Sequence, residues 1–526
     1  MEQSRYNGSS TISLADEYAT NDGQDLRATL TVLFHPDSAR IGERAQPGDD
    51  ISLSRYEPHF LDAEGRARAL DDPVLSRRPV RFQRLPTGAL AVHPASKGNP
   101  LSIDGERVHE TRVLPREVLA DGVVLTVARR VVLLWHLARP IGPRMCDSAL
   151  IGTSDGMQRV REDIERVAGL PVPVLIRGES GVGKELVAQA IHQGSERRER
   201  PLLSVNMGAV PASTAVSELF GHVKGAFTGA GSDHPGYFVQ ADGGTLFLDE
   251  IGEAAPEVQV ALLRVLETGE IRPLGGKRSR RVDVRLLAAT DLQLERAVAE
   301  GRFRQPLLHR LASYDIRVPP LRARKADIGQ LFAHFLRAEL AALSEPDRLR
   351  PPAAGAATWL PPRYVARLAR YAWPGNVRQL RNVARQVAIG NVGRERFELP
   401  EAVRATLAAP VARASASEPA SEPASEPDER TRPARLDVSD EQLLAALRAH
   451  RFRVEPAARK LGIARASLYR LMNRSPRIRL ARDLSAAEIS ACAERHAGDV
   501  EAMAEALEVS SRALRLRMTE LGLDQH

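Results

Sequence analysis

Two short strings constrain the middle of this 526-residue chain. The first, GESGVGKE at residues 178–185, contains three glycines that let backbone N–H groups approach a phosphate, and Lys184 to neutralise its charge. The second, GGTLFLDE at residues 243–250, is an apolar strand ending in two carboxylates, as needed to hold magnesium and a hydrolytic water. Together they predict a nucleotide-binding α/β domain.

A third string, ELFGHVKGAFTGA at residues 218–230, lies between the first two. Phosphate binding does not require it. It is rich in glycine and carries Phe227 and Thr228 at what should be a loop tip. A mobile loop built into a nucleotide-hydrolysing domain indicates that hydrolysis moves something.

The three strings together resemble one family, the bacterial enhancer-binding activators of sigma-54 RNA polymerase. The resemblance covers roughly residues 149–399 and, more loosely, the C-terminus. It implies an AAA+ ATPase that uses ATP and Mg²⁺, forms a homo-oligomeric ring, expected to be a hexamer, and remodels the closed promoter complex of the sigma-54 RNA polymerase holoenzyme. GAFTGA is the polymerase-contacting motif of that family, which implies contacts by Gly225, Ala226, Phe227, Thr228, Gly229 and Ala230.

The same resemblance assigns roles within the nucleotide site. Asp249 is expected to organise Mg²⁺ through water, and Glu250 to polarise the attacking water. Arg304 and Arg310 are expected to act on the nucleotide of a neighbouring subunit, where an arginine stabilises charge on the transferring phosphoryl group. The implied catalytic residues are Glu250, Asp249, Arg304, Arg310 and Asn206, where Asn206 senses the orientation of Glu250. The implied nucleotide-binding residues are Gly178, Glu179, Ser180, Gly181, Val182, Gly183, Lys184, Glu185, Thr290 (sensor I) and Arg378 (sensor II, within WPGNVRQL).

The sequence departs from the family at a few of these positions. Glu185 stands where most phosphate loops have Ser or Thr, and Asp291 follows Thr290 in place of an asparagine. Gln305 and Pro306 replace acidic residues between the two arginines, and proline can distort a helix.

Two other classes of protein share part of this pattern. A protease unfoldase or helicase of the AAA+ class would have the same ATP site, but no reason to carry GAFTGA before a DNA-binding motif. A non-catalytic repressor that uses ATP only as a ligand would not need Glu250 or the two arginines.

The N-terminal region reads as a flexible tail, residues 1–25, followed by short strands and turns over 26–140, which predict a β-sandwich. This region weakly resembles a forkhead-associated (FHA) domain, a phosphothreonine reader. The resemblance implies a phosphothreonine protein partner, with a kinase upstream. A phosphate-independent protein-binding domain is the alternative. The candidate phosphate contacts are Arg40, Arg44, Ser76, Arg77 and Asn99, because arginine forks and hydroxyls suit phosphate.

The rest of the chain divides by composition. The predicted fold is multidomain: an FHA-like β-sandwich, an AAA+ α/β P-loop core at 148–320 with a helical lid at 321–407, and an all-α C-terminus with tandem helix-turn-helix units. Residues 408–436 contain a Ser-Glu-Pro repeat and read as a semi-extended linker. The basic turn GGKRSRR at 275–281 is either a DNA-facing loop or the solvated tip of a second insertion.

The C-terminus contains an internal repeat, with copies at 437–482 and 483–526. The first copy resembles a Fis-type helix-turn-helix and has 11 Lys and Arg against 4 Asp and Glu; the second has 4 against 9. Since phosphate contact dominates DNA affinity, the first copy is the better candidate to bind enhancer DNA. In the second copy, Glu508 replaces the turn glycine. This copy would serve dimerisation, read DNA through its arginines, or be structural. The candidate DNA contacts are Arg465, Ser467, Tyr469 and Arg470.

Composition sets the remaining limits. The formal net charge of +7 is modest for this length, so basic patches must be local. Cys146 and Cys492 are the only cysteines, which fits a reducing cytoplasm. The most apolar stretch, residues 122–138, is broken by two arginines and is too short to span a bilayer, so no membrane partner is expected.

Overall fold

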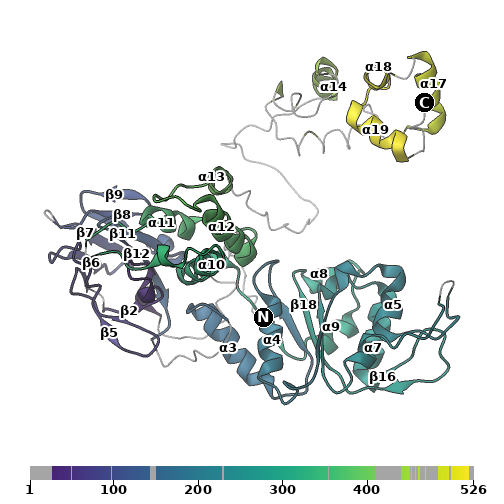
Figure 1. The fold of residues 1–526 in the computed structure, drawn as a ribbon, viewed down its shortest axis with the longest axis horizontal. Helices are drawn as coiled ribbons and strands as arrows, with labels where there is room; N and C mark the ends of the chain where they lie inside the picture. Colours follow the sequence, from purple (N-terminus) through teal and green to yellow (C-terminus); the bar gives the residue numbers. More distant parts are fainter. Residues whose placement is uncertain are drawn as a thin grey trace, which may run out of the picture. The chain divides into compact units, whose positions relative to one another are not determined.

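A computed structural model describes residues 26–141, 150–408 and 440–520, apart from gaps at 49, 96–97, 228–229, 354, 451, 453–456, 458–459, 462–467, 469–483 and 497–498. The chain forms two compact units, residues 1–414 and 415–526. The first contains a strand-rich domain, an α/β core and a helical lid (Figure 1).

The N-terminal domain consists of short antiparallel strands in two sheets. One sheet has the strand order β5-β4-β2-β1-β12-β11-β8-β9, and the other has the order β10-β7-β6-β3. The two sheets share a buried apolar core that includes Leu30, Leu53 and Phe82. Their elements are β1 (Arg27–Phe34), β2 (Arg44–Ala45), β3 (Asp50–Leu53), β4 (Phe60–Leu61), β5 (Ala67–Arg68), β6 (Val80–Arg84), β7 (Leu90–His93), β8 (Leu101–Ile103), β9 (Glu106–Val108), β10 (Arg112–Leu114), α2 (Arg116–Ala120), β11 (Val123–Val127) and β12 (Val131–Ala138).

The α/β core confirms the expected parallel sheet, with the strand order β14-β15-β18-β13-β19. Leu175 faces one apolar core, and Val174 and Ile176 face the other, so helices cover both faces. The helices and strands are α3 (Asp155–Ala168), β13 (Val174–Arg177), α4 (Lys184–Gln193), β14 (Leu202–Asn206), α5 (Ala212–Phe220), α6 (Tyr237–Gln240), β15 (Thr245–Asp249), α7 (Pro256–Thr268), β16 (Glu270–Ile271), β17 (Arg280–Arg281), β18 (Arg285–Thr290), α8 (Leu294–Ala299), α9 (Gln305–Leu311) and β19 (Asp315–Arg317).

The lid is helical, as expected. It contains α10 (Ile328–Ala342), α11 (Pro362–Arg370), α12 (Asn376–Gly390) and α13 (Glu401–Ala408). Trp373 is fully buried between α11 and α12, and its indole N–H donates to the Leu368 carbonyl at 2.9 Å. This satisfied hydrogen bond lets a large polar-tipped side chain sit in the lid core.

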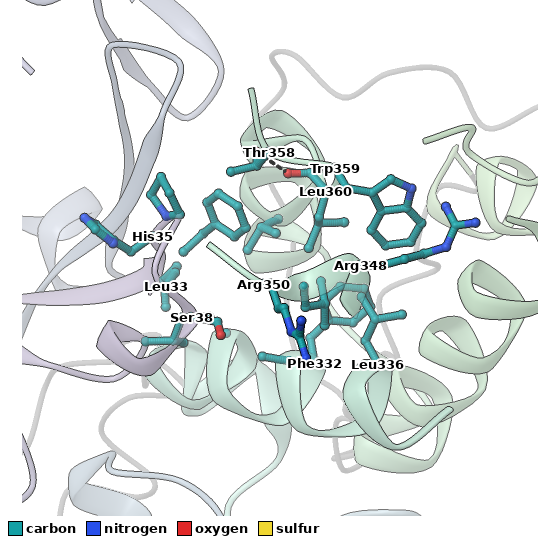
Figure 2. Close-up of a pocket in the computed structure, with 17 residues that line it drawn as sticks. Leu33, His35, Ser38, Phe332, Leu336, Arg348, Arg350, Thr358, Trp359 and Leu360 are labelled. Carbon is teal, nitrogen blue, oxygen red and sulfur yellow. Dashed lines mark hydrogen bonds between the residues drawn. The ribbon is translucent and has the colours of Figure 1, made fainter. Parts of the chain in front are cut away.

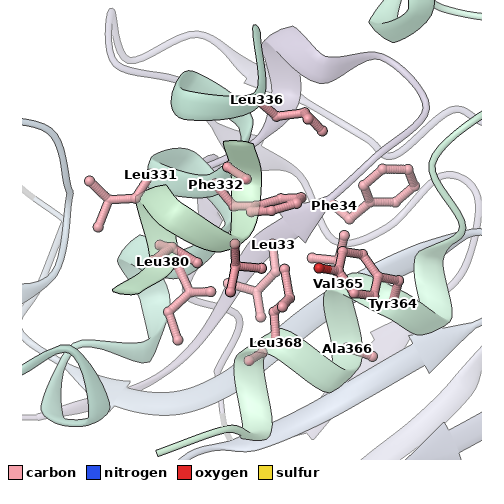
Figure 3. Close-up of a cluster of buried hydrophobic side chains, with 14 of the residues drawn as sticks. Leu33, Phe34, Leu331, Phe332, Leu336, Tyr364, Val365, Ala366, Leu368 and Leu380 are labelled. Carbon is pink, nitrogen blue, oxygen red and sulfur yellow. The ribbon is translucent and has the colours of Figure 1, made fainter. Parts of the chain in front are cut away.

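The lid and the N-terminal domain share a single apolar core. Val131, Leu133 and Trp135 of β12 face the core of their own domain, whereas Val132 and Leu134 join the lid core. Side chains alternate across a strand, so β12 is buried on both faces. Figure 3 shows Leu33 of β1 lying among the lid side chains. The most apolar stretch of the sequence, residues 122–138, therefore forms two neighbouring strands, β11 and β12, and each has side chains in both cores.

The C-terminal unit is described in part. Its helices include α14 (Asp440–Ala449) in the first copy and α17 (Ala486–Arg495), α18 (Val500–Ala506) and α19 (Ser511–Glu520) in the second. Ser485 and Glu488 form a reciprocal capping box at the start of α17. Within the described residues of the whole chain, no helix is long and apolar enough to cross a membrane.

Candidate functional site

The nucleotide-site motifs meet at one edge of the parallel sheet. The phosphate loop follows β13, Asp249 ends β15, Thr290 ends β18 and Asn206 ends β14. Because these strands are parallel and adjacent, their carboxyl ends lie together, the usual ligand-binding edge of an open α/β sheet. The sequence motifs are thus brought into one place by the topology.

The phosphate loop has the backbone that its glycines predict. Gly181 and Gly183 have φ values of 78° and 107°, the left-handed region that favours glycine. Helix α4 begins at Lys184, so its free N–H groups point at the loop. The Lys184 ammonium donates to the Gly178 carbonyl at 2.7 Å, which holds it beside the loop.

The Lys184 ammonium is surrounded by carboxylates, so the site has a positive group that suits an anion and negative groups that suit a cation. Burial lowers the pKa of Lys184, while the carboxylates of Asp291, Asp249 and Glu250 oppose that change. Three carboxylates thus lie close enough to interact with one ammonium. Asp249 also accepts the backbone N–H of Glu250 at 3.0 Å, which fixes its carboxylate at the strand end.

Glu250 occupies strained backbone next to Asn206. Its φ of 55° is left-handed, an uncommon conformation for a side-chain-bearing residue and one found at functional sites. A Cβ added to Gly208 would collide with the Glu250 carboxylate and lie 3.3 Å from the Asn206 side-chain oxygen. Asn206 accepts the Ala209 N–H at 3.2 Å. Glu250 and Asn206, the residue expected to sense its orientation, therefore border the same glycine.

The lid reaches the phosphate loop through Arg378. Its guanidinium donates to the Ser180 hydroxyl at 3.2 Å, and its backbone N–H donates to the Gly181 carbonyl at 3.2 Å. A Cβ on Gly181 would lie 2.7 Å from the Gly375 carbonyl, so this close approach requires glycine. The structure places the expected sensor II residue at the site.

Two residues of this junction escaped the sequence-based prediction. The Arg322 guanidinium donates to both carboxylate oxygens of Glu179, and the longer of the two contacts is 2.8 Å. The Asn376 side-chain amide donates to the Glu179 carboxylate at 3.0 Å and to the Ser180 carbonyl at 3.1 Å. The Arg322 hydrogen bond is the main cause that lowers the pKa of Glu179, with Asn376 adding to it. Asn376 lies inside WPGNVRQL, so the motif itself could have identified it as a residue of the site. Arg322 is 143 residues from Glu179 in the sequence, and no sequence pattern links the two.

The two expected trans-acting arginines lie at opposite ends of α9. Arg304 occupies the N-cap position of α9, and its backbone N–H donates to the Gln259 side-chain oxygen at 2.9 Å. Arg310, in the last turn, is exposed and lies 3.8 Å from the Glu267 carboxylate. Pro306 stands in the first helical turn, where a missing N–H costs no hydrogen bond. The expected distortion of the helix is therefore absent from α9. Glu185 is exposed on the first turn of α4.

The GAFTGA loop lies beside the basic turn at residues 275–281. Phe227 is 42% exposed and packs edge-on against His222, with ring centroids 5.0 Å apart. The Val223 N–H donates to the Leu274 carbonyl at 3.1 Å, and a Cβ on Gly275 would lie 2.8 Å from Ala226. The basic turn after Leu274 thus supports the loop base, and β16 and β17 pair on either side of it. Thr228 and Gly229 lie outside the described residues.

The candidate phosphate contacts of the N-terminal domain separate into two groups. Arg40 is buried and pairs with Glu43 at 2.7 Å, and Arg44 is buried and lies 3.5 Å from Asp155 of α3. Both guanidinium groups therefore have partners inside the protein. In contrast, the Ser76 N–H donates to the Asn99 side-chain oxygen at 2.8 Å. The neighbouring Arg77 is exposed, and the Asn99 amide nitrogen is buried with no hydrogen-bond partner among the described residues.

The candidate DNA contacts Arg465, Ser467, Tyr469 and Arg470 fall outside the residues whose structure is described. The second copy is better defined. Glu508, which replaces the turn glycine, has a φ of 55° and pairs with Arg448 of the first copy at 2.7 Å. The residue that departs from the helix-turn-helix pattern therefore contacts the other copy.

Three family models match the chain. They are the Sigma-54 interaction domain (residues 150–317), the AAA+ ATPase lid domain (322–406) and the Bacterial regulatory protein, Fis family (436–474). The DNA-binding transcriptional regulator NtrC of Escherichia coli K12 is 42% identical over 452 residues, covering 81% of this chain and 94% of NtrC. This chain belongs to the sigma-54-dependent transcriptional activators.

Other relatives match this activator over shorter spans. The Nif-specific regulatory protein of Azospirillum lipoferum is 39% identical over 366 residues, which is 67% of this chain and 55% of that protein. The anaerobic nitric oxide reductase transcription regulator NorR of Vibrio vulnificus is 47% identical over 249 residues, 47% and 46% of the two chains. A crystal structure of NtrX from Brucella abortus in complex with ATP is 31% identical, covers 62% of this activator and 69% of NtrX, and superposes with a TM-score of 0.42.

The Glu179–Arg322 contact generates a prediction for nucleotide affinity. Arg322→Ala should weaken binding of a fluorescent ATP analogue about three- to tenfold, because the lid loses its bidentate hold on the phosphate loop; this corresponds to roughly 0.7–1.4 kcal/mol. Arg296→Ala, which removes an exposed pair with Glu300 on α8, is the matched control. Equal affinity of the two variants and the unsubstituted chain would show that the contact does not position the lid.

Proposed function

We propose that this activator hydrolyses ATP in a homo-oligomeric ring, expected to be a hexamer, and uses the GAFTGA loop to remodel the closed complex of sigma-54 RNA polymerase. The observation that supports it most is the meeting of Lys184, Asp249, Glu250 and Arg378 at one sheet edge, on the same domain as a projecting Phe227. A ligand-only repressor would not need this arrangement.

The proposed roles combine the position of each residue with what the family resemblance implies. Lys184 and the N-terminus of α4 bind the β- and γ-phosphates. Asp249, a fixed carboxylate at a strand end, suits Mg²⁺, which prefers oxygen ligands and neutralises phosphate charge when bound. Glu250 orients the water that attacks the γ-phosphate, and Asn206 responds to its orientation. Arg304 and Arg310 act on the nucleotide of the adjacent subunit.

A matched set of substitutions tests hydrolysis and coupling separately. Lys184→Ala should abolish nucleotide binding, whereas Glu250→Ala and Arg310→Ala should retain binding and lose turnover by at least about 100-fold. Thr228→Ala should keep substantial ATPase activity yet fail to open a sigma-54 promoter in a permanganate footprint. Full promoter opening by Thr228→Ala would overturn the polymerase-contact role of the loop.

We also propose that the first C-terminal copy carries most of the affinity for enhancer DNA, through Arg465, Ser467, Tyr469 and Arg470. Its excess of basic residues favours phosphate contact. The second copy is acidic, and its Glu508 contacts Arg448, which suits a docking role.

The DNA proposal predicts a difference between two truncations. A chain ending at Leu436 should lose specific binding in a mobility-shift titration, whereas one ending at Arg482 should keep part of it, because the first copy remains. Equal binding by the Leu436 truncation and the full chain would contradict the assignment.

We propose further that the N-terminal domain is FHA-like and reads a phosphothreonine on a partner protein. Ser76, Asn99 and the exposed Arg77 supply the hydroxyl, amide and guanidinium that such a phosphate needs. The buried Asn99 amide nitrogen supports this, since it has no hydrogen-bond partner in the part of the chain that the structure describes, and such a donor is costly unless a ligand accepts it. Arg40 and Arg44 hold the domain together and to α3, so they are second-choice contacts.

Calorimetric titration with a phosphothreonine peptide library tests this pocket. Ser76→Ala combined with Arg77→Ala should weaken binding at least about tenfold, as expected for the loss of charge-assisted hydrogen bonds. Arg84→Ala serves as a control that removes an exposed arginine of β6. Indifference to phosphorylation would leave a phosphate-independent docking domain.

A further inference from the structure

The N-terminal domain contacts both halves of the ATPase, and the lid contact is the larger. Leu33 and Phe34 of β1 lie in a buried cluster with Phe332 of α10 and Val365 of α11 (Figure 3). All four side chains are withdrawn from water. Fully burying a side chain of this size contributes about 1.5–3 kcal/mol, so this contact is a strong one.

The closest approach in this interface is at Gly329. A Cβ added to this helical glycine would lie 2.8 Å from the Leu33 Cα and still closer to the Leu33 carbonyl oxygen. Helix α10 therefore rests on the backbone of β1 itself. In a helix interior glycine costs about 1 kcal/mol relative to alanine, so the contact, and not the helix, requires glycine here.

Polar contacts surround the apolar centre. The Lys325 ammonium donates to the Asp121 carbonyl at 2.7 Å, and Gln330 donates to the Ile41 carbonyl at 3.3 Å. Arg337 donates to the Ser38 carbonyl at 3.3 Å. Each donor belongs to the lid side and each acceptor is a backbone carbonyl of the N-terminal domain, so together they fix the orientation of the two parts.

A second attachment joins the same domain to the α/β core. Arg44 donates to the Thr153 carbonyl at 3.2 Å and lies 3.5 Å from Asp155. Asp155 also accepts the Arg139 N–H at 2.6 Å. Burial lowers the pKa of the Arg44 guanidinium, and the Asp155 carboxylate opposes the change, so removing Asp155 would leave a buried charge without this partner.

The two attachments flank the junction between lid and core. There the buried Asp327 accepts hydrogen bonds from Thr153 N–H, Ser154 N–H and the Ser154 hydroxyl at 2.6–2.7 Å. A cleft of about 410 Å³ beside this junction is lined by all three parts, including Ile41, Arg161 and Gln330. The N-terminal domain therefore spans the joint about which the lid would move.

We propose that the N-terminal domain is a brace that holds the lid in one position relative to the core and so slows ATP turnover. The inference rests on the proposed hydrolysis, in which Arg378 on the lid and Lys184 on the core must close and reopen around nucleotide. Contacts made in only one lid position stabilise that position and disfavour every other. A signal that loosens the domain would then release the lid.

The packing of the interface is consistent with a contact that opens. A cavity of about 30 Å³ remains between β1 and the lid, lined by residues that include Phe34, Phe332 and Trp359 (Figure 2). Side chains that line a void lose part of their dispersion contacts. The interface is therefore not completely filled.

Gly329→Ala in the full chain is the central test. Alanine favours the helix, so α10 should stay folded while its new methyl group pushes β1 away. We expect faster hydrogen exchange in residues 27–34 and 328–342 and a rise in basal ATPase activity of at least threefold. The control is Gly169→Ala, at a helix end with open space around its Cβ, which should change neither.

A second variant releases the other attachment. Asp155→Ala removes the partner of Arg44 and Arg139 while Ser154 still caps α3, so it should also raise turnover at least threefold. Increased exchange with unchanged or lower turnover in both variants would overturn the brace, and unchanged exchange in Gly329→Ala would overturn the contact itself. Lack of turnover in the unsubstituted chain and in both variants would instead contradict hydrolysis. The brace would then be judged by whether ATP alters exchange in 328–342 more in Gly329→Ala than in the unsubstituted chain, and an equal change would overturn it.

Discussion

Glu179 joins the phosphate loop to the lid through Arg322 and Asn376, and the contact of Arg378 with the same loop lies beside this junction. A bidentate charge-assisted pair contributes about 1.5–3 kcal/mol when shielded. The Glu179 and Arg322 side chains are 37% and 29% exposed, so solvent reduces this to roughly 1 kcal/mol. Micromolar nucleotide binding is worth about 8 kcal/mol. The junction is therefore strong enough to set a resting lid position and weak enough for bound nucleotide to change it.

The N-terminal domain alters this balance because it adds apolar burial on one side of the lid. Burial of Leu33 and Phe34 alone contributes several kcal/mol by area, on the order of 3–6 kcal/mol. A ligand shifts a two-state equilibrium only by its differential affinity, and reversing a 1:99 ratio requires about 5.5 kcal/mol. A single phosphopeptide contact would therefore loosen the lid partly, whereas complete separation would require several contacts or a partner surface. A graded response is the physical expectation for such a brace.

The sequence predicted those parts of the molecule that depend on local pattern. The phosphate loop, the strand before Asp249 and the parallel sheet follow from glycine placement and apolar runs, and the structure confirms them. Contacts between distant segments could not be predicted in this way. Residue type makes Arg40 and Arg44 candidates for phosphate contact, and it does not predict that Glu43 and Asp155 lie against them. The apolar run 122–138 does contain such information: apolar segments without alternation are typical of strands covered on both faces, and β11 and β12 are covered in this way by the sandwich core and the lid helices.

The geometry around Glu250 suggests how a change at the nucleotide would reach Phe227. Glu250 and Asn206 border Gly208, and Asn206 is followed by a 3-10 turn (Met207–Ala209) and then by α5, which ends at Phe220. A helix of nine residues spans about 13 Å and moves as a rigid body. At its end the Ser217 hydroxyl lies 2.7 Å from the His222 ring, and that ring packs on Phe227. A rotation of Asn206 would therefore have a continuous route to the loop base, through the turn that its side chain caps, α5, the Ser217–His222 contact and the His222–Phe227 ring contact.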